Sequence, residues 1–202
     1  MPPTLDGPTA RTSGYAPVHG LRMYYEIDGT GDPLVYIPNA FGFAGLTRFP
    51  ALAQCRSVIS VDLQGHGRTA DLPERPLSIE QHADDVVALL THLGIAKADF
   101  FGASYGGAAA MMIAVRYPEL VRRVVAVGAT FGPPQSAHNV GMLRFDRPLT
   151  AHAQGFRFQR ESYATVAPDP GDWPKIWEKV AGIRWDGFSA EQLASVGAMV
   201  LI

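Results

Sequence analysis

The chain of 202 residues is long enough for one globular domain with a modest insertion. Its apolar content of 47%, charged content of 18% and net charge of −2 give no sign of a surface for nucleic acid or membranes. No run approaches the roughly 18 consecutive apolar residues of a membrane span. The single cysteine, Cys55, excludes an internal disulfide and fits a reducing compartment, so we expect a cytoplasmic protein.

The N-terminal part predicts a tail followed by a hairpin. Residues 1–14 are rich in Pro, Thr and Gly and contain no apolar run, which indicates a flexible tail and not a signal peptide. Residues 15–28 predict two strands that turn at His19-Gly20.

Two short apolar runs each predict a buried strand followed by a loop. Residues 34–38 lead into a small-residue loop at 39–45 and a short helix near 46–53. Residues 57–63 lead into the loop 64–69. Unbroken apolar runs of this length are typical of strands that are covered on both faces.

Helices and strands alternate in the next part of the chain. Ser78 precedes apolar residues at helical spacing, which predicts a capped helix over residues 79–93 that stops at Gly94. Residues 122–130 predict another buried strand. This alternation favours an α/β fold with a mostly parallel, doubly wound sheet.

A Gly-x-Ser-x-Gly motif lies between these elements. An aromatic-rich strand runs into Gly102, Ser104 and Gly106, and an alanine-rich helix follows. The pattern predicts a tight strand-to-helix bend with Ser104 at its tip, because glycine leaves room for a crowded backbone. The helix N-terminus directs N–H groups and a partial positive charge toward the hydroxyl. Ser104 is therefore the candidate nucleophile; the alternative is a tight turn that happens to contain serine.

The loops of such a sheet predict where a ligand binds. Ligands of parallel sheets bind beyond the C-terminal ends of the strands. We therefore expect a pocket for a small-molecule substrate at the edge formed by residues 39–45, 64–69 and 130–134 and the turn at Ser104.

Residues 131–194 predict a helical cap inserted over the strand ends. This segment has clustered prolines and short helical pieces such as residues 173–183, without a strand-like run. Its tryptophans are candidate pocket or core residues: Trp173, Trp177 and Trp185. The expected organisation is a flexible tail (1–14), a core (15–130), a cap insertion (131–194) and a returning buried core strand (195–202).

Three segments carry a resemblance to a known family: Gly-Ala-Ser-Tyr-Gly-Gly at 102–107, Asp-Leu-Gln-Gly-His-Gly-Arg-Thr at 62–69 and the loop after residues 34–38. In these segments the chain resembles the α/β-hydrolase superfamily. The branch is that of capped esterases, lactonases and C–C-bond hydrolases. The resemblance implies an oxyanion hole made by the backbone N–H groups of Tyr105 and, by position, Phe41. Losing one such donor typically costs on the order of 100- to 1000-fold in rate. The early loop usually carries His-Gly, where this sequence has Asn39-Ala40.

No histidine of the sequence stands in a motif for a general base. His66, in Gly-His-Gly, corresponds in the family to a structural loop residue. His82 and His92 are expected to be solvated on their helix, and His138 and His152 fall in the cap. Metal-ligand spacing, a phosphate loop and a dinucleotide fingerprint are all missing, so we expect no metal and no other cofactor.

The resemblance also implies the order of the catalytic residues. In the superfamily the acid and then the histidine follow the nucleophile along the chain. Both would come after the strand near residues 196–202. We therefore expect the chain to be the N-terminal portion of a longer hydrolase, without the C-terminal strand and helices of the core. Such a portion should be nearly inactive alone, because serine without a base is a poor nucleophile.

These observations predict a serine hydrolase of a small ester, lactone or related carbonyl compound. A serine nucleophile argues against the epoxide-hydrolase and haloalkane-dehalogenase branches, which use an aspartate there, while peptidase and cofactor-free peroxidase activities stay open. One alternative is a non-catalytic ligand-binding protein on a degenerate hydrolase fold. Another is that a second polypeptide supplies the missing strand and histidine. The substrate and the oligomeric state do not follow from the sequence.

Overall fold

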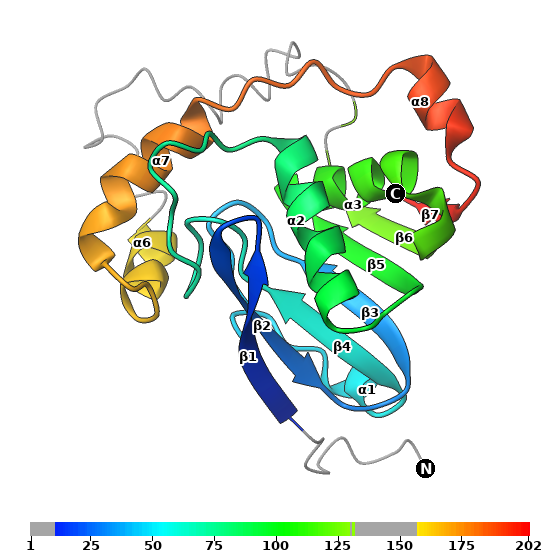
Figure 1. The fold of residues 1–202 in the computed structure, drawn as a ribbon, viewed down its shortest axis with the longest axis horizontal. Helices are drawn as coiled ribbons and strands as arrows, with labels where there is room; N and C mark the ends of the chain where they lie inside the picture. The colour runs from blue at the N-terminus through cyan, green and yellow to red at the C-terminus, as the bar shows by residue number, and fades with distance from the viewer. Residues whose placement is uncertain (1–10, 130, 132–156) are drawn as a thin grey trace.

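A sheet of seven strands forms the centre of the molecule (Figure 1). The computed structural model describes residues 11–129, 131 and 157–202. The strands are β1 (Arg11–Val18), β2 (Leu21–Asp28), β3 (Asp32–Ile37), β4 (Arg56–Val61), β5 (Ala98–Ala103), β6 (Val121–Val127) and β7 (Met199–Leu201). Their order is β1-β2-β4-β3-β5-β6-β7, antiparallel between β1, β2 and β4 and parallel from β4 to β7. The predicted α/β fold with a mostly parallel sheet is confirmed.

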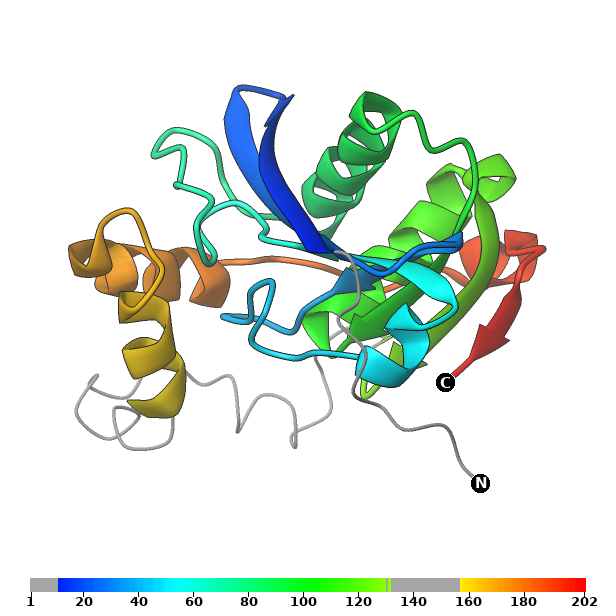
Figure 2. The ribbon, with the colours of Figure 1, turned by 90° about the horizontal axis from the view of Figure 1, so that it is seen from below.

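Helices cover this sheet and one of its ends. The α-helices are α1 (Pro50–Ala53), α2 (Ile79–His92), α3 (Tyr105–Arg116), α6 (Arg157–Ala164), α7 (Trp173–Ala181) and α8 (Ala190–Ser195). Short 3₁₀ turns lie at Pro118–Leu120 and Pro170–Asp172. Helices α2 and α3 lie side by side against one face of the sheet, whereas α6 and α7 lie beyond the C-terminal ends of the parallel strands (Figures 1 and 2). No helix in these ranges is long and apolar enough to cross a membrane.

The main core lies between the sheet and helices α2 and α3. Phe100 of β5 and Ile37 of β3 are fully buried there. Helix α2 begins where the sequence predicted, because the Ser78 side chain accepts a hydrogen bond of 3.1 Å from the backbone N–H of Gln81. Helix α3 presents Ala108, Ala109 and Ala110 as buried side chains, and such small residues let the helix approach the sheet closely.

A second apolar cluster lies under α6 and α7. It consists of Phe41, Leu77, Tyr163, Trp173, Ile176, Trp177 and Val180. Lys179 of α7 ties this helix to the core, because its Nζ donates to Asp71 Oδ2 at 2.7 Å and to the carbonyl of Leu72 at 2.8 Å. Helices α6 and α7 fall within the predicted cap insertion, of which residues 132–156 lie outside the described residues.

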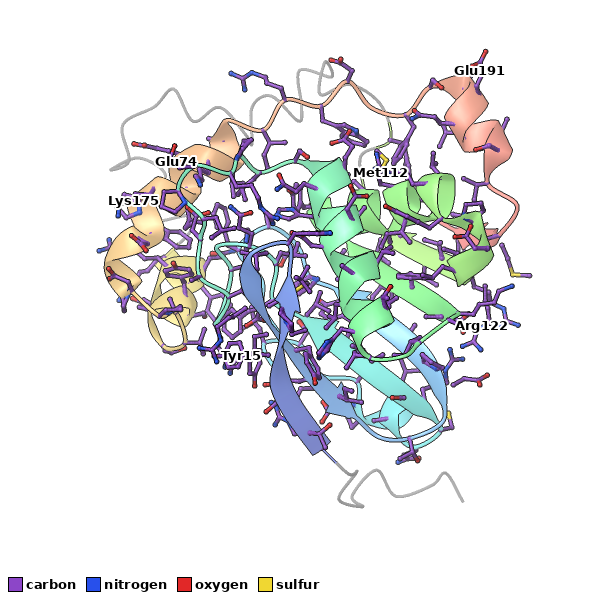
Figure 3. The ribbon with its side chains drawn as sticks, in the orientation of Figure 1. Tyr15, Glu74, Met112, Arg122, Lys175 and Glu191 are labelled. Carbon is purple, nitrogen blue, oxygen red and sulfur yellow. The ribbon has the colours of Figure 1, made fainter. Side chains whose placement is uncertain are left out.

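The opposite end of the sheet carries an ionic cluster. The buried carboxylate of Asp99 binds Arg56 and accepts a hydrogen bond of 3.2 Å from Arg122. Figure 3 labels Arg122 at this end of the sheet and Lys175 of α7 at the other. These hydrogen bonds between charged groups join the N-terminal ends of β4, β5 and β6. Ligands of parallel sheets bind at the other end, beyond the C-terminal ends of the strands.

Three predicted boundaries were wrong. Strand β1 begins at Arg11, inside the predicted tail, because Arg11 to Gly14 pair with Asp28 to Tyr25 of β2. The helix expected near residues 46–53 starts only at Pro50, a residue suited to the first turn of a helix. The final strand spans Met199–Leu201 and is exposed, not buried, because it pairs with β6 alone and forms the edge of the sheet.

The cap of α2 generates a test of local stability. Replacing Ser78 by Ala removes the acceptor of the Gln81 N–H and should lower the free energy of unfolding by about 1 kcal/mol. The melting temperature should fall by roughly 2–4 °C. Thr91→Ala, an exposed position on the same helix, serves as the control and should change stability by less than about 0.5 kcal/mol. Equal effects of the two substitutions would contradict the capping role.

Candidate active site

Ser104 occupies a strained turn between β5 and α3. Its φ of 51° and ψ of −114° lie in a region that residues with a side chain rarely adopt. The backbone N–H of Ser104 donates to the carbonyl of Val127 at 2.8 Å, which fixes the turn to the end of β6. The side chain is exposed. The structure therefore presents the hydroxyl group at the N-terminus of α3, where the helix dipole is positive.

The glycines around Ser104 make this turn sterically feasible. A Cβ atom on Gly102 would lie 2.2 Å from the carbonyl oxygen of Gly106. A Cβ atom on Gly106 would lie 2.1 Å from the carbonyl oxygen of Ile37 and 2.4 Å from that of Pro38. These neighbours are backbone atoms that cannot move aside. The same contacts show that the first turn of α3 touches the end of β3, where the loop that contains Phe41 begins.

Phe41, the second residue of the predicted oxyanion hole, also has an unusual backbone conformation. Its φ of 66° is left-handed, and its side chain is only 3% exposed. The ring stacks on Trp177 at a centroid distance of 5.2 Å and an interplanar angle of 9°, and it contacts Trp173 at 4.9 Å. Because α7 holds the ring, the backbone of this loop is also held. His19, Phe41 and Ser104 are the residues other than glycine with positive φ in the described ranges.

Asp62 joins the loop after β3 to the loop after β4. Its carboxylate accepts hydrogen bonds from the backbone N–H groups of Ala44 and Arg68, the latter at 2.7 Å. Burial raises the pKa of Asp62 to about 7, and the two N–H groups oppose this rise. A Cβ atom on Gly67 would lie 2.2 Å from Asp62 Oδ2, so glycine is needed there.

The expectation that His82 is solvated was wrong. His82 is fully buried, and its Nδ1 forms a hydrogen bond of 2.6 Å with the hydroxyl group of Tyr105. Helical spacing could have revealed this burial, because His82 follows Ile79 by three residues and precedes Val86 by four. Burial lowers the pKa of the imidazole well below its usual value, and the neighbouring His66 and Arg75 lower it further.

His66 is a buried loop residue, as the sequence predicted. It is 1% exposed, and its Nδ1 lies 2.8 Å from the carbonyl oxygen of Gln64. Since a carbonyl only accepts, Nδ1 carries the proton and Nε2 is the acceptor. Burial lowers the pKa of His66 and keeps it neutral.

The other candidate residues lie away from Ser104 or outside the described residues. His19 sits at the hairpin turn with its Nδ1 2.9 Å from Asp85 Oδ1, and His92 is exposed at the end of α2. His138 and His152 lie in the part of the chain that is not described. No histidine within residues 11–129 or 157–202 forms a hydrogen bond with the Ser104 side chain. The same ranges contain no cluster of three or more His, Cys, Asp or Glu side chains able to hold a metal ion.

Two tryptophans of the predicted cap are buried and the third is partly buried. Trp173 and Trp177 belong to the second apolar cluster and are 6% and 5% exposed. Trp185 packs edge-on against Phe188 at a centroid distance of 5.0 Å, beside the main core.

Comparisons with known proteins identify relatives of the chain. The family model described as "alpha/beta hydrolase fold" matches residues 41–166, which is more than half of the chain. The chain is 34% identical over 139 residues to bifunctional epoxide hydrolase 2 of Sus scrofa, and these cover 66% of this chain and 25% of that protein. It is 36% identical over 143 residues to 3-oxoadipate enol-lactonase 2 of Acinetobacter baylyi, and these cover 68% of this chain and 50% of that protein. The matches thus span a quarter to a half of these relatives.

A solved structure shows the same fold. The meta-cleavage product hydrolase of Pseudomonas fluorescens IP01 superposes with a TM-score of 0.72 at 20% sequence identity. The superposition covers 94% of this chain and 77% of that one.

The crowding at Gly106 predicts an effect of adding one methyl group. Gly106→Ala would place Cβ against two carbonyl oxygens at 2.1 and 2.4 Å, and we expect a loss of about 3 kcal/mol or more of unfolding free energy. Chemical denaturation measures it. Gly197→Ala is the matched control, because its Cβ would meet nothing within 4 Å and its φ is not positive. A Gly106→Ala protein as stable as this control would refute the crowded turn.

The buried histidines predict a pH dependence of stability. The lowered pKa of His82 means that the unfolded chain binds more protons than the folded one below about pH 6.5, so stability falls as the pH falls. The raised pKa of Asp62 acts in the opposite direction between about pH 4 and 7. Comparison with His82→Asn isolates the histidine. Between pH 6.5 and 5, the free energy of unfolding of the parent should fall more steeply than that of this variant, by up to about 1.4 kcal/mol per pH unit. Equal slopes in denaturation experiments would show that His82 binds a proton in the folded protein.

Proposed function

The chain belongs to the alpha/beta hydrolase fold family, and we propose that it acts as a serine hydrolase on a small ester, lactone or related carbonyl compound. The observation that carries the proposal is the strained turn at Ser104. A serine with a φ of 51°, exposed at the N-terminus of α3 and enclosed by obligatory glycines, is costly to maintain for structure alone. Strain of this kind is concentrated at functional sites.

The proposed mechanism uses a hydroxyl group and two backbone donors. Ser104 Oγ attacks the carbonyl carbon while a general base takes its proton, and a tetrahedral intermediate forms with negative charge on oxygen. The N–H groups of Tyr105 and Phe41 donate to this oxygen and stabilise it without reorganising. The alcohol or enol leaves with the proton of the base. Water then attacks the acyl-enzyme in the same way and frees Ser104.

In this proposal, none of the described histidines serves as the general base. The described histidines are engaged with Asp85, Gln64 and Tyr105 or exposed at the end of α2, and none contacts the Ser104 hydroxyl group. We propose that a histidine and an acid outside the described residues complete the site in the protein expressed from its complete coding sequence. The 77% coverage of the Pseudomonas hydrolase supports this proposal.

The relatives guide the choice of substrate class. The Acinetobacter relative is named an enol-lactonase, which supports a lactone or ester carbonyl as the reacting group. The Sus scrofa relative is named an epoxide hydrolase, but the serine at position 104 argues against epoxide opening, for which the related branch uses an aspartate. A lactone or ester therefore fits the name of the Acinetobacter relative and a serine nucleophile.

Removal of the nucleophile tests the proposal. In the protein expressed from its complete coding sequence, Ser104→Ala should reduce hydrolysis of p-nitrophenyl butyrate at least about 1000-fold, because it removes the hydroxyl group that forms the acyl-enzyme in this proposal. A fluorophosphonate should label the parent at Ser104, as peptide mass spectrometry will show.

An exposed serine provides the control. Ser195→Ala, on α8, should keep both hydrolysis and labelling. Retention of full hydrolysis by Ser104→Ala, or labelling of another serine, would contradict the nucleophile. A parent that binds lactones stoichiometrically but neither hydrolyses them nor reacts with the phosphonate would support the non-catalytic ligand-binding alternative.

A further inference from the structure

Four rings form a row between the two proposed oxyanion donors. Phe41 stacks on His66 at a centroid distance of 6.1 Å, and His66 meets His82 edge-on at 6.2 Å. His82 meets Tyr105 at 5.3 Å, again edge-on. The row therefore leads from the loop after β3, through the loop after β4 and helix α2, to the first residue of α3.

The first turn of α3 lacks the usual means of fixing a helix end. Ser104 is the N-cap residue, and its side chain accepts no hydrogen bond from the helix, as its use as a nucleophile requires. The strained φ and ψ of Ser104 also favour relaxation of this turn. The bond from the Ser104 N–H group to the carbonyl of Val127 holds Ser104 itself, so a further contact is needed to hold the side chain of the next residue, Tyr105.

The hydrogen bond between Tyr105 and His82 provides that contact. At 2.6 Å it is short, and it joins the side chain of the first residue of α3 to a fully buried residue of α2. His82 belongs to the second turn of a helix whose N-cap Ser78 is hydrogen-bonded, so it is a fixed point. Because the N–H group of Tyr105 precedes its Cα directly, holding the side chain restricts the direction of this N–H group.

A histidine at this position has a stability cost that an apolar residue would not have. Within the described residues, the Nε2 atoms of His66 and His82 are buried without a hydrogen-bond partner. Such orphaned polar atoms destabilise a fold, and in natural proteins they call for an explanation beyond packing. Leucine would fill the position on α2 without an orphaned ring nitrogen. The feature that histidine adds is the bond from Nδ1 to Tyr105.

We infer that His82 is a positioning residue of the oxyanion hole, which holds the Tyr105 N–H group in place through the Tyr105 hydroxyl group. The inference rests on the proposed function. It makes Tyr105 a residue with two tasks: its backbone stabilises the intermediate, and its side chain fixes that backbone. Because His82 is fully buried, it acts through Tyr105 and not directly on a substrate.

A set of variants tests the inference in the protein expressed from its complete coding sequence. Tyr105→Phe and His82→Leu each remove the bond, and each should lower kcat for p-nitrophenyl butyrate about tenfold, less than the loss of a whole donor. KM should stay within about twofold, because the donor acts in the transition state. The double variant should lose no more than either single variant, since both remove one interaction. Active sites titrated with the fluorophosphonate give kcat per folded site.

Stability and rescue distinguish positioning from a structural role. In the double variant no polar atom of the pair remains, so its melting temperature should lie within about 2 °C of the parent while kcat stays low. His82→Asn keeps a hydrogen-bonding group near the place of Nδ1 and should recover most of kcat. His92→Leu, at an exposed position on the same helix, is the control and should keep parental kcat.

Two results would overturn the inference. One is parental kcat per titrated site in Tyr105→Phe and His82→Leu, with only their melting temperatures lowered. The other is a loss of about 100-fold in the double variant, which would show that the two residues act independently. If Ser104→Ala is inactive in either case, the proposed function survives. Full activity of Ser104→Ala would instead overturn the proposed function itself.

Discussion

The crowded backbone at Ser104 is the constraint on which the site depends. The turn brings the first residues of α3 so close to β3 that a methyl group on Gly106 would lie 2.1 Å from the carbonyl oxygen of Ile37. This close approach places a serine hydroxyl group and the N-terminus of a helix at one point of the sheet edge. It also places the loop after β3 beside that point. A looser turn would hold the proposed nucleophile but would not bring the second proposed oxyanion donor near it.

Several other interactions serve to fix the loops around this turn. The carboxylate of Asp62 holds the loops after β3 and β4 together, and the ring of Phe41 is held by Trp177 of α7. Lys179 anchors α7 in turn through Asp71. These contacts are buried or partly buried, which makes them more rigid and electrostatically stronger than contacts at the surface. Oxyanion stabilisation requires such rigidity, because its effect comes from dipoles that do not reorganise.

Much of this arrangement could be predicted from the sequence, where local rules decide. The apolar runs predicted the central strands, Ser78 predicted the start of α2, and the glycines predicted the turn at Ser104. Predictions failed where tertiary neighbours decide. Pairing with β2 extends β1 to Arg11, and the edge position exposes the last strand. His82 looked like a surface residue because its type is polar, although its helical position is buried. Its bond to Tyr105 joins residues 23 positions apart, which no local pattern contains.

The most direct test of the site is a crystal structure of the protein expressed from its complete coding sequence with a phosphonate bound to Ser104. The bound group imitates the tetrahedral intermediate, so one of its oxygens reports the position of the oxyanion. We expect that oxygen to lie about 2.7–3.1 Å from the backbone nitrogens of both Tyr105 and Phe41. An adduct whose oxygens lie away from both nitrogens, or no adduct at Ser104, would contradict the proposed site.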